Sequence, residues 1–377
     1  MQLFRLISNI LRMNYKDLAN PGVFDQPTYV PGKSIADVAK EFELDINAID
    51  KLASNESPWG PSPLAKTAIR ESVDSMHLYP DGSCYDLSLA IAQKFGLGID
   101  NILVGNGSNE LIELLGHVFL RPGLNAVVGS YSFIVYRLVA RLFGAEVLEV
   151  PMKAMAHDLG AMFEAINQDT RIVFVASPNN PTGMANSEAE LTEFIQKLPE
   201  HVILCFDEAY AEYLEHAPNL IPWIEQGKKI LCLRTFSKIY GLGGLRVGYG
   251  YGHSELIGLL NRVRQPFNVN SLGQVGALAA LGDQAFVNDC KAMNAQGRKQ
   301  LVEGLTSLGY KTYGGAANFV LCQVGAGQRV FEELQKRGVI IRPLNNYNLP
   351  DFVRITIGTE EENQRLLDLM PLIQDEI

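Results

Sequence analysis

A single lysine, Lys238, stands between hydroxyl-bearing residues and a glycine-rich turn. The apolar run from Lys229 to Leu233, typical of a buried strand, comes just before it. A lysine among apolar groups loses its proton at moderate cost, because desolvation disfavours the charged ammonium. The neutral amine is a nucleophile that can form a Schiff base. Lys238 is therefore a candidate covalent catalyst.

Phosphate-binding groups accompany this lysine. The hydroxyls of Thr235 and Ser237 and the guanidinium of Arg246, which follows the glycine-rich turn, can together hold a phosphate. A reactive lysine next to a phosphate site suggests pyridoxal phosphate. Since most lysines are simply solvated, this hypothesis requires other groups elsewhere in the chain. They are a carboxylate for the pyridine nitrogen, a donor for the ring oxygen, an aromatic face and further phosphate ligands.

The segment from Gly105 to Asn109 offers such phosphate ligands. It joins a predicted strand at residues 102–104 to a helical pattern, so Ser108 and Asn109 fall at a helix N-terminus. Free N–H groups and the helix dipole favour a phosphate there. A plain strand-to-helix turn is the alternative. Glu110 occupies the place of the third glycine of a dinucleotide fingerprint, so one phosphate fits better than two.

Asn179 lies in a loop, Ala176 to Gly183, that directly follows a predicted strand. Turn-forming residues alone would explain such a loop. However, two asparagines between prolines at the carboxyl end of a strand make a rigid platform of hydrogen-bond donors. We expect Asn179 to bond the oxygen of a pyridine ring.

Asp207 ends the apolar run of another predicted strand. A carboxylate in such a place is costly unless it is paired, and a protonated pyridine nitrogen is a suitable partner. Tyr210, three residues later, can donate to the ring oxygen. A helix N-cap is the common alternative role for a lone aspartate. The presence of Asn179 and Lys238 in the same chain makes that alternative less favoured.

Three further residues suit a cofactor or an anionic substrate. Tyr131 follows a predicted strand and could stack on the ring, although an ordinary core aromatic is the alternative. Arg342 and Arg354 each interrupt an apolar strand, a placement typical of bidentate anion recognition or of a structural salt bridge. The six histidines show no metal-ligand spacing, so we expect no metal.

Predicted strands and helices alternate between residues 102 and 249, which favours an α/β fold with a mainly parallel sheet covered by helices on both faces. Ligands of such sheets bind at the carboxyl ends of the strands, where the residues above fall. After residue 270 the pattern changes to a long helical stretch at 271–307, short strands at 319–322, 339–342 and 353–357, and a terminal helix at 360–373. This later part predicts a smaller α+β domain.

Composition excludes several classes of protein. The 377 residues carry a net charge of −10 and contain no dense cluster of lysine and arginine, so nucleic-acid and anionic-membrane binding are not expected. No apolar run approaches the roughly 18 residues of a membrane span.

The N-terminal dozen residues lack a cleavage site, and Met13 is an alternative start. Five scattered cysteines without C-x-x-C spacing fit a reduced, cytoplasmic setting.

Taken together, these residues resemble the fold-type I, class II aminotransferases that depend on pyridoxal 5'-phosphate. The resemblance covers the chain from about residue 24 and is closest to the histidinol-phosphate aminotransferase family. It is carried most specifically by residues 54–63, 78–82, 264–270 and 354–359. It implies a large cofactor domain with a seven-stranded sheet at 55–265, an N-terminal arm with part of the small domain at 1–54, and a small domain at 266–377.

The resemblance also implies a role for each candidate residue. Lys238 would hold the cofactor as a Schiff base, Asp207 would pair with the pyridine nitrogen, Asn179 and Tyr210 would bond the ring oxygen, and Tyr131 would stack. The cofactor phosphate would be bound by Ser108, Asn109, Ser237, Arg246 and, from the neighbouring subunit of a homodimer, Tyr79. The substrate would contact Tyr29, Asn55, Arg342 and Arg354. One departure is Gly129-Ser130 before Tyr131, where relatives usually have Pro-Thr.

The implied reaction is amino transfer from L-histidinol phosphate, a small-molecule donor, to 2-oxoglutarate. An aromatic amino-acid aminotransferase and a threonine-phosphate decarboxylase share the same cofactor residues and remain alternatives within the enzyme class. A cofactor-binding regulatory module without catalysis is the alternative outside it. No DNA-binding segment accompanies the intact lysine constellation, which disfavours that third reading.

Overall fold

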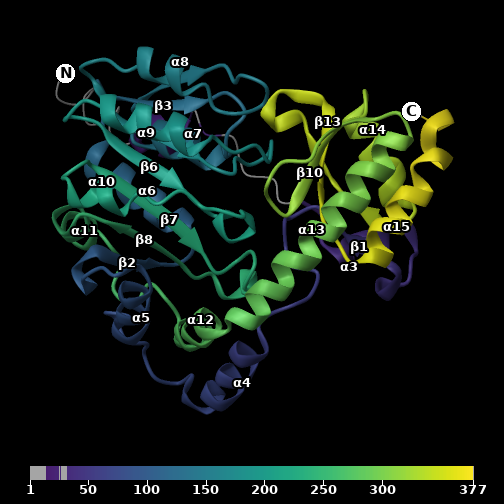
Figure 1. Cartoon of the computed structure of the whole chain (residues 1–377), viewed down its shortest axis with the longest axis horizontal. Helices are drawn as coiled ribbons and strands as arrows, with labels where there is room; N and C mark the ends of the chain where they lie inside the picture. Colours follow the sequence, from purple (N-terminus) through teal and green to yellow (C-terminus); the bar gives the residue numbers. More distant parts are fainter. Residues whose placement is uncertain (1–13, 25, 27–31, 377) are drawn as a thin grey trace, which may run out of the picture.

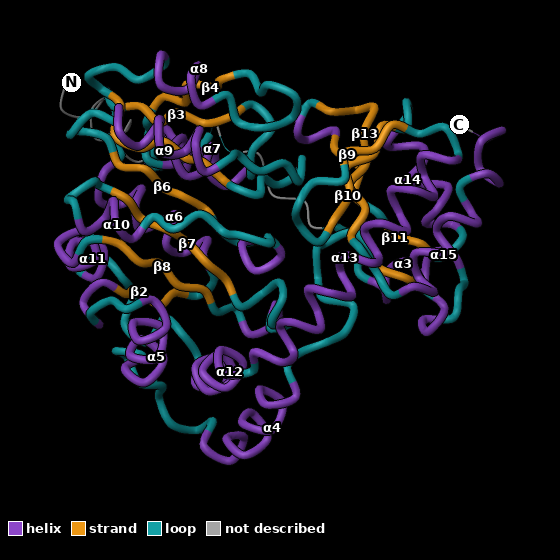
Figure 2. Tube along the Cα trace, viewed as in Figure 1, coloured by secondary structure: helices purple, strands orange, loops and turns teal. Residues whose placement is uncertain are grey.

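A seven-stranded sheet forms the centre of the larger of two lobes (Figures 1 and 2). The computed structural model describes residues 14–24, 26 and 32–376. All strands of the sheet are parallel except β8, which is antiparallel to both of its neighbours. In spatial order the strands are β2 (Ile102–Gly105), β8 (Gly248–Gly252), β7 (Ile230–Thr235), β6 (Ile203–Asp207), β5 (Thr170–Ala176), β3 (Asn125–Gly129) and β4 (Glu146–Val150). The mainly parallel sheet confirms the predicted α/β class.

Helices cover both faces of this sheet because its central strands are apolar on both sides. In β6, Leu204 and Phe206 belong to one buried cluster, whereas Ile203 and Cys205 belong to the other. The first cluster lies under α5 (Tyr85–Phe95), α8 (Leu159–Glu164), α9 (Glu188–Lys197), α10 (Ile221–Glu225) and α12 (Ser271–Gly282), with α4 (Pro63–Ser72) packed on α12. The second lies under α6 (Ser108–Phe119), α7 (Ile134–Leu142) and α11 (Ser254–Asn261).

The small lobe combines the C-terminal part of the chain with an N-terminal segment. Its antiparallel sheet has the order β12 (Arg342–Leu344), β13 (Leu349–Thr356), β10 (Phe319–Gln323) and β9 (Lys311–Tyr313). A second, two-stranded sheet pairs β1 (Asp50–Lys51) in parallel with β11 (Val339–Ile340). The lobe also contains α3 (Ile35–Phe42), α13 (Gln284–Ser307), α14 (Gly327–Lys336) and α15 (Glu360–Leu369), and a short α2 (Tyr15–Leu18) lies near the start of the described chain.

The single long helix expected at residues 271–307 is wrong in one respect, since the structure divides it into α12 and α13. Asp283 lies between them with non-helical backbone, and its side chain accepts from the N–H of Phe286, which caps α13. The break changes the direction of the chain. α12 packs against α4 and α5 of the large lobe, whereas α13 runs on to the small lobe (Figure 1).

The strand expected at residues 339–342 is also divided. Ile340 ends β11, Arg342 begins β12, and the two strands join different sheets. The terminal helix ends at Leu369, and a 3-10 helix from Pro371 follows it. A proline cannot continue the hydrogen-bond ladder of an α-helix. No helix in the described part of the chain has the length and hydropathy of a membrane span.

Candidate active site

A cavity of about 200 Å³ opens at the carboxyl ends of β5, β6 and β7. Ala176, Asp207 and Thr235 end these three strands and all line the cavity. The first turn of α6 and the segment before and within α7 complete its wall. Of the residues predicted from the sequence, the cavity brings together Ser108, Asn109, Asp207, Tyr210, Ser237, Lys238 and Arg246.

Lys238 follows β7 and points its amine into this enclosed space. Its Nζ lies 3.4 Å from the carbonyl oxygen of Ser54 and 5.8 Å from the centre of the Tyr210 ring. Burial, reinforced by the positive charge of Arg354, lowers the pKa of Lys238 to about 8. The amine is therefore much more readily deprotonated than an ordinary lysine, which is what a nucleophile or a proton carrier requires.

Asp207 is 6% exposed and holds a carboxylate at the floor of the cavity. Its Oδ1 accepts from the N–H of Ala209 at 3.0 Å, and its Oδ2 accepts from the hydroxyl of Tyr136 at 2.6 Å. Burial raises the pKa of Asp207, and these two hydrogen bonds oppose that rise. A cationic group that entered the cavity next to Asp207 would find a partly desolvated anion, a strong partner.

Tyr210 is held by Asn55. The Asn55 Nδ2 donates to the Tyr210 hydroxyl oxygen at 2.8 Å, while the Asn55 backbone, at a left-handed φ of 56°, is tied to the small lobe. Its N–H donates to Thr356 Oγ1, and its carbonyl accepts from Asn318 Nδ2. Burial raises the pKa of Tyr210 to about 12, so the hydroxyl keeps its proton. Because Asn55 donates to the oxygen, that proton can point elsewhere.

The first turn of α6 forms an anion cradle with Arg246. No side chain caps this helix at Gly107, so its first N–H groups are left for a ligand. Gly107 has a φ of 76°, and a Cβ there would lie 2.5 Å from Nη2 of Arg246. The Arg246 Nη1 donates to Ser237 Oγ at 3.3 Å. Helix N-terminus, hydroxyl and guanidinium thus converge as phosphate recognition requires.

Asn179 and Tyr131 lie behind the lining of the cavity, of which neither is part. The Asn179 Nδ2 donates to the Tyr131 carbonyl and to Thr182 Oγ1, both at 2.9 Å. The Asn179 Oδ1 is buried and has no hydrogen-bond partner in the described chain. Phe133, two residues after Tyr131, supplies an aromatic side chain to the lining instead.

Gly129, the departure before Tyr131, has a steric reason. The ring of His157 occupies the space beside it, and a Cβ at residue 129 would lie 2.6 Å from Nδ1 of His157. Burial lowers the pKa of His157 to about 4, so this histidine is neutral near pH 7. The glycine therefore accommodates a buried imidazole between the end of β3 and the loop after β4.

Arg342 and Arg354 lie directly opposite each other on the antiparallel strands β12 and β13. Arg354 is 6% exposed and bridges the two lobes, because its Nη1 donates to Asn180 Oδ1 at 2.5 Å and its Nη2 to the Ala53 carbonyl at 2.6 Å. Asn180 in turn lines the cavity. Arg354 thus stands at the side of the site that faces the small lobe, whereas the Arg342 guanidinium lies beside Gly32 and does not line the cavity.

Tyr79 is not among the residues that line the cavity of this chain. Tyr79 is 83% exposed and stacks on Phe267, with ring centres 5.0 Å apart. Tyr29 lies outside the described residues. No group of three or more potential metal ligands occurs within the ranges 14–24, 26 and 32–376.

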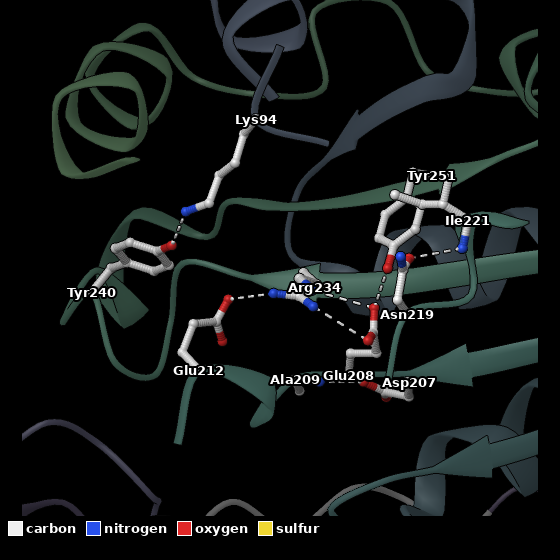
Figure 3. A network of polar contacts seen from close by, with 10 residues as sticks. All are labelled: Lys94, Asp207, Glu208, Ala209, Glu212, Asn219, Ile221, Arg234, Tyr240 and Tyr251. Atoms are coloured by element: carbon white, nitrogen blue, oxygen red, sulfur yellow. Dashed lines mark hydrogen bonds and ion pairs between the residues drawn. The ribbon is translucent and has the colours of Figure 1, made fainter. Parts of the chain in front are cut away.

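A buried ionic network lies beside the carboxyl ends of β6 and β7 (Figure 3). Arg234 contacts Glu208 at 3.3 Å and Glu212 at 3.2 Å, and the Tyr251 hydroxyl donates to Glu208 at 2.6 Å. Although burial works against its charge, the two glutamates raise the pKa of Arg234 well above its ordinary value. Glu208 follows Asp207, and Arg234 precedes Thr235, so the network ties β6 to β7 beneath the cavity.

Sequence reasoning missed Tyr136 and Phe133. Tyr136 lies in α7 and Phe133 is the N-cap of that helix, within the region of alternating strands and helices predicted at 102–249, where an aromatic residue is expected to pack in the core. A tyrosine on the apolar face of that helix was the available signal, since a buried hydroxyl needs a hydrogen-bond partner. The partner itself, Asp207, is 71 residues away in the chain.

Comparison with known proteins agrees with this geometry. The model of the family "Aminotransferase class I and II" matches residues 47–369. Histidinol-phosphate aminotransferase 2 of Nitrosospira multiformis is 43% identical over 358 residues, 94% of this chain and 91% of its own. Histidinol-phosphate aminotransferase 2 of Pseudomonas fluorescens is 44% identical over 356 residues, 94% of this chain and 96% of its own.

Among solved structures, histidinol-phosphate aminotransferase from Sinorhizobium meliloti in complex with pyridoxal-5'-phosphate has a TM-score of 0.86 and 25% identity. The similarity covers 95% of this chain and 98% of that one. A double mutant of Thermus thermophilus aspartate aminotransferase has a TM-score of 0.81 and 26% identity, covering 94% and 99%. Since the family model spans most of the chain and relatives above 40% identity cover more than nine-tenths of it, this chain belongs to the class I and II aminotransferases.

Proposed function

We propose that this chain is a histidinol-phosphate aminotransferase that uses pyridoxal 5'-phosphate. The reaction is L-histidinol phosphate + 2-oxoglutarate = 3-(imidazol-4-yl)-2-oxopropyl phosphate + L-glutamate. The observation that carries the proposal is the convergence on one cavity of Lys238, Asp207 and the uncapped N-terminus of α6. The names of the relatives at 43% and 44% identity support the choice of substrate.

The residues of the cavity fit the cofactor. Ser108, Asn109, Ser237 and Arg246 would hold its phosphate, since an uncapped helix end and a guanidinium both favour that anion. Asp207 would face the ring nitrogen. Tyr210 has a proton free for the ring oxygen. Asn179 would also donate to that oxygen after its Nδ2 leaves one of its present partners.

The aromatic side chain that stacks on the cofactor ring is proposed to come from the segment after β3. Phe133 lines the cavity, whereas Tyr131 contributes its carbonyl to Asn179 and packs toward the apolar cluster of the small lobe. We therefore place both residues as candidates for stacking, with Phe133 favoured by its position. Replacing each in turn by leucine and measuring cofactor affinity separates the two.

When bound, pyridoxal phosphate supplies an electrophilic carbon for the amino group and a ring that accepts electrons from the substrate Cα. Lys238 would hold the cofactor and then, as a neutral amine, take a proton from the donor Cα and return one to the acceptor. Its pKa of about 8 places it close to the pH at which such a base works best. Asp207, kept anionic, would hold the ring nitrogen protonated.

The two arginines are proposed as substrate ligands. Arg342 and Arg354 lie opposite each other, and two guanidinium groups can engage the phosphate of histidinol phosphate as well as the second carboxylate of 2-oxoglutarate. One pair of cations thus serves two substrates of different shape. Asn55 and Tyr29 stay proposed substrate contacts, although the Asn55 amide is engaged by Tyr210.

Assembly and location are part of the proposal. A homodimer with shared sites would bring Tyr79 to the cofactor phosphate of the partner, and its 83% exposure leaves it accessible to a second copy. A cytoplasmic location agrees with five cysteines that are all free and buried. The division at 1–54, 55–265 and 266–377 also stays a proposal, and limited proteolysis tests it.

Stopped-flow absorbance tests the function. Mixing the holoenzyme with L-histidinol phosphate should rapidly remove the absorbance band of the lysine-bound cofactor, and 2-oxoglutarate should restore it. A faster response to L-phenylalanine would make the protein an aromatic aminotransferase. Release of CO2 from L-threonine phosphate would make it a decarboxylase. Absence of the band after addition of pyridoxal phosphate would contradict the assignment of Lys238.

A further inference from the structure

Tyr136 is the only tyrosine among the cavity-lining residues other than Tyr210, and the proposed reaction leaves it without a role. It belongs to α7 and is wholly buried. Its ring stacks on Phe174 of β5, with centres 4.7 Å apart and planes 9° apart, and meets the edge of Phe133. These contacts hold the ring in one orientation, with its hydroxyl 2.6 Å from Asp207 Oδ2.

The direction of this hydrogen bond is fixed. Burial and the neighbouring Asp207 raise the pKa of Tyr136 well above its ordinary value, so the proton stays on the tyrosine. Asp207 therefore accepts at both oxygens, from Tyr136 at one and from the N–H of Ala209 at the other. Each donor stabilises the ionised carboxylate relative to the protonated one.

Other charges around Asp207 do not replace this donor. Glu208, the first residue after β6, favours the protonated carboxyl of Asp207, whereas Lys238 favours the ionised form. Lys238 is in turn expected to become neutral during the reaction, which removes that support. Tyr210 keeps its proton as well, because burial raises its pKa to about 12. Tyr136 is thus the one side-chain hydrogen-bond donor to Asp207 in the described chain.

We propose that Tyr136 is a positioning residue that keeps Asp207 ionised and aimed at the ring nitrogen of the cofactor. The inference rests on the proposed function, because only a pyridine nitrogen gives Asp207 this task. With the Tyr136 donor in place, the proton shared between nitrogen and carboxylate stays on the nitrogen. Without it, the carboxylate becomes the stronger base, and the proton moves toward Asp207.

The test compares two tyrosine-to-phenylalanine variants of the holoenzyme. Tyr136→Phe keeps the stacked ring and removes only the hydroxyl. Tyr251→Phe is the matched control, since Tyr251 also donates at 2.6 Å to a buried carboxylate, that of Glu208. Glu208 and Asp207 are adjacent in sequence but point to opposite faces of the sheet. The two variants should therefore lose similar stability, and only one should affect the cofactor.

The primary readout is the ¹⁵N chemical shift of pyridoxal phosphate labelled at the ring nitrogen, followed with pH. We expect Tyr136→Phe to shift this resonance toward the unprotonated value and to weaken cofactor affinity about tenfold. Tyr251→Phe should match the wild type in both. Equal behaviour of the two variants in shift and affinity would overturn the inference. A wild-type protein that binds no pyridoxal phosphate would instead overturn the proposed function.

A second substitution covers the case in which Tyr136→Phe does not fold. Replacement of Tyr136 by 3-fluorotyrosine retains the ring and the hydroxyl and makes the hydroxyl a stronger donor. It should hold the nitrogen proton to higher pH than in the wild type. An unchanged pH profile for this protein would overturn the proposed role of Tyr136.

Discussion

Arg342 and Arg354 are direct cross-strand neighbours, paired Cα to Cα between β12 and β13. Like charges placed directly opposite each other on a sheet destabilise it. Arg354 is fixed by Asn180 and Ala53, so it also has a structural task, whereas Arg342 is only partly buried. An anionic substrate bound at the proposed arginine pair would relieve this repulsion.

Arg342→Gln separates these two effects. Without substrate, the variant should be as stable as the wild type or slightly more stable, because a like-charge contact is removed. Its kcat/KM for L-histidinol phosphate should fall about 10- to 100-fold, the loss of a hydrogen bond to a charged group. Steady-state kinetics and urea unfolding measure the two quantities. Equal kcat/KM in variant and wild type would exclude Arg342 from the substrate site.

Lys238→Met should stabilise the cofactor-free protein near neutral pH. The unfolded chain keeps the lysine proton up to a pKa near 10.5, whereas the folded chain releases it at about 8. The stability of the wild type should therefore rise from pH 8 to 10.5, and the variant should lack this rise. The advantage of the variant should be at most about 3 kcal/mol at pH 7 and should shrink as the pH increases.

Urea unfolding of the cofactor-free proteins across pH 6 to 11 checks this prediction. Lys299→Met is the control, since the Lys299 side chain is 73% exposed and should leave the pH profile as in the wild type. A constant difference between Lys238→Met and wild type across the whole pH range would mean that Lys238 is not desolvated in the folded protein.

Gly129→Ala should destabilise the protein by about 1–3 kcal/mol, the usual cost of overpacking. The new Cβ would lie 2.6 Å from His157 Nδ1 and 2.8 Å from the Met152 methyl. Combining it with His157→Ala should recover part of the loss, because the smaller side chain makes room. Gly258→Ala, in α11 with no atom near its added Cβ, should be neutral or stabilising. Additive losses in the double variant would exclude His157 as the cause.

Arg234→Met should cost about 3–5 kcal/mol of stability, because it leaves Glu208 and Glu212 buried without their cation. Burial already raises the pKa of Glu212 against the opposing effect of Arg234. Adding Glu208→Gln and Glu212→Gln should restore much of the loss, since no unpaired charge remains. Thermal unfolding of the three proteins checks this. A triple variant less stable than Arg234→Met alone would contradict the explanation.

Tyr79 should act across the proposed dimer. Tyr79→Phe keeps the stack on Phe267 and removes the hydroxyl, so the protein should remain folded and lose most of its cofactor affinity. Mixing it with Lys238→Ala should restore activity, because one site of each mixed dimer then has both wild-type residues. Activity that does not exceed the sum of the separate variants would indicate that Tyr79 serves its own subunit or none.

Several features followed from local patterns in the sequence. Apolar runs of strand length, separated by amphipathic segments, determined the parallel sheet and its covering helices, because such strands must be buried on both faces. Parallel strands end at one edge of the sheet, so Asp207 and Lys238, which follow or end such strands, are expected to lie close together there. The glycine turn before Ser108 placed the uncapped N-terminus of α6, the proposed phosphate site, at that same edge.

Other features were decided only in the tertiary structure, since they depend on which distant side chains meet. Tyr136 bonds Asp207, 71 residues away in the chain, and Asn55 bonds Tyr210, 155 residues away. No local sequence pattern therefore predicts these hydrogen bonds. The register of β12 against β13 aligns the two arginines. Asp283 divides one helical pattern into two helices because their faces pack on different lobes. Residue types supplied the chemistry of the site, and packing selected the partners that orient it.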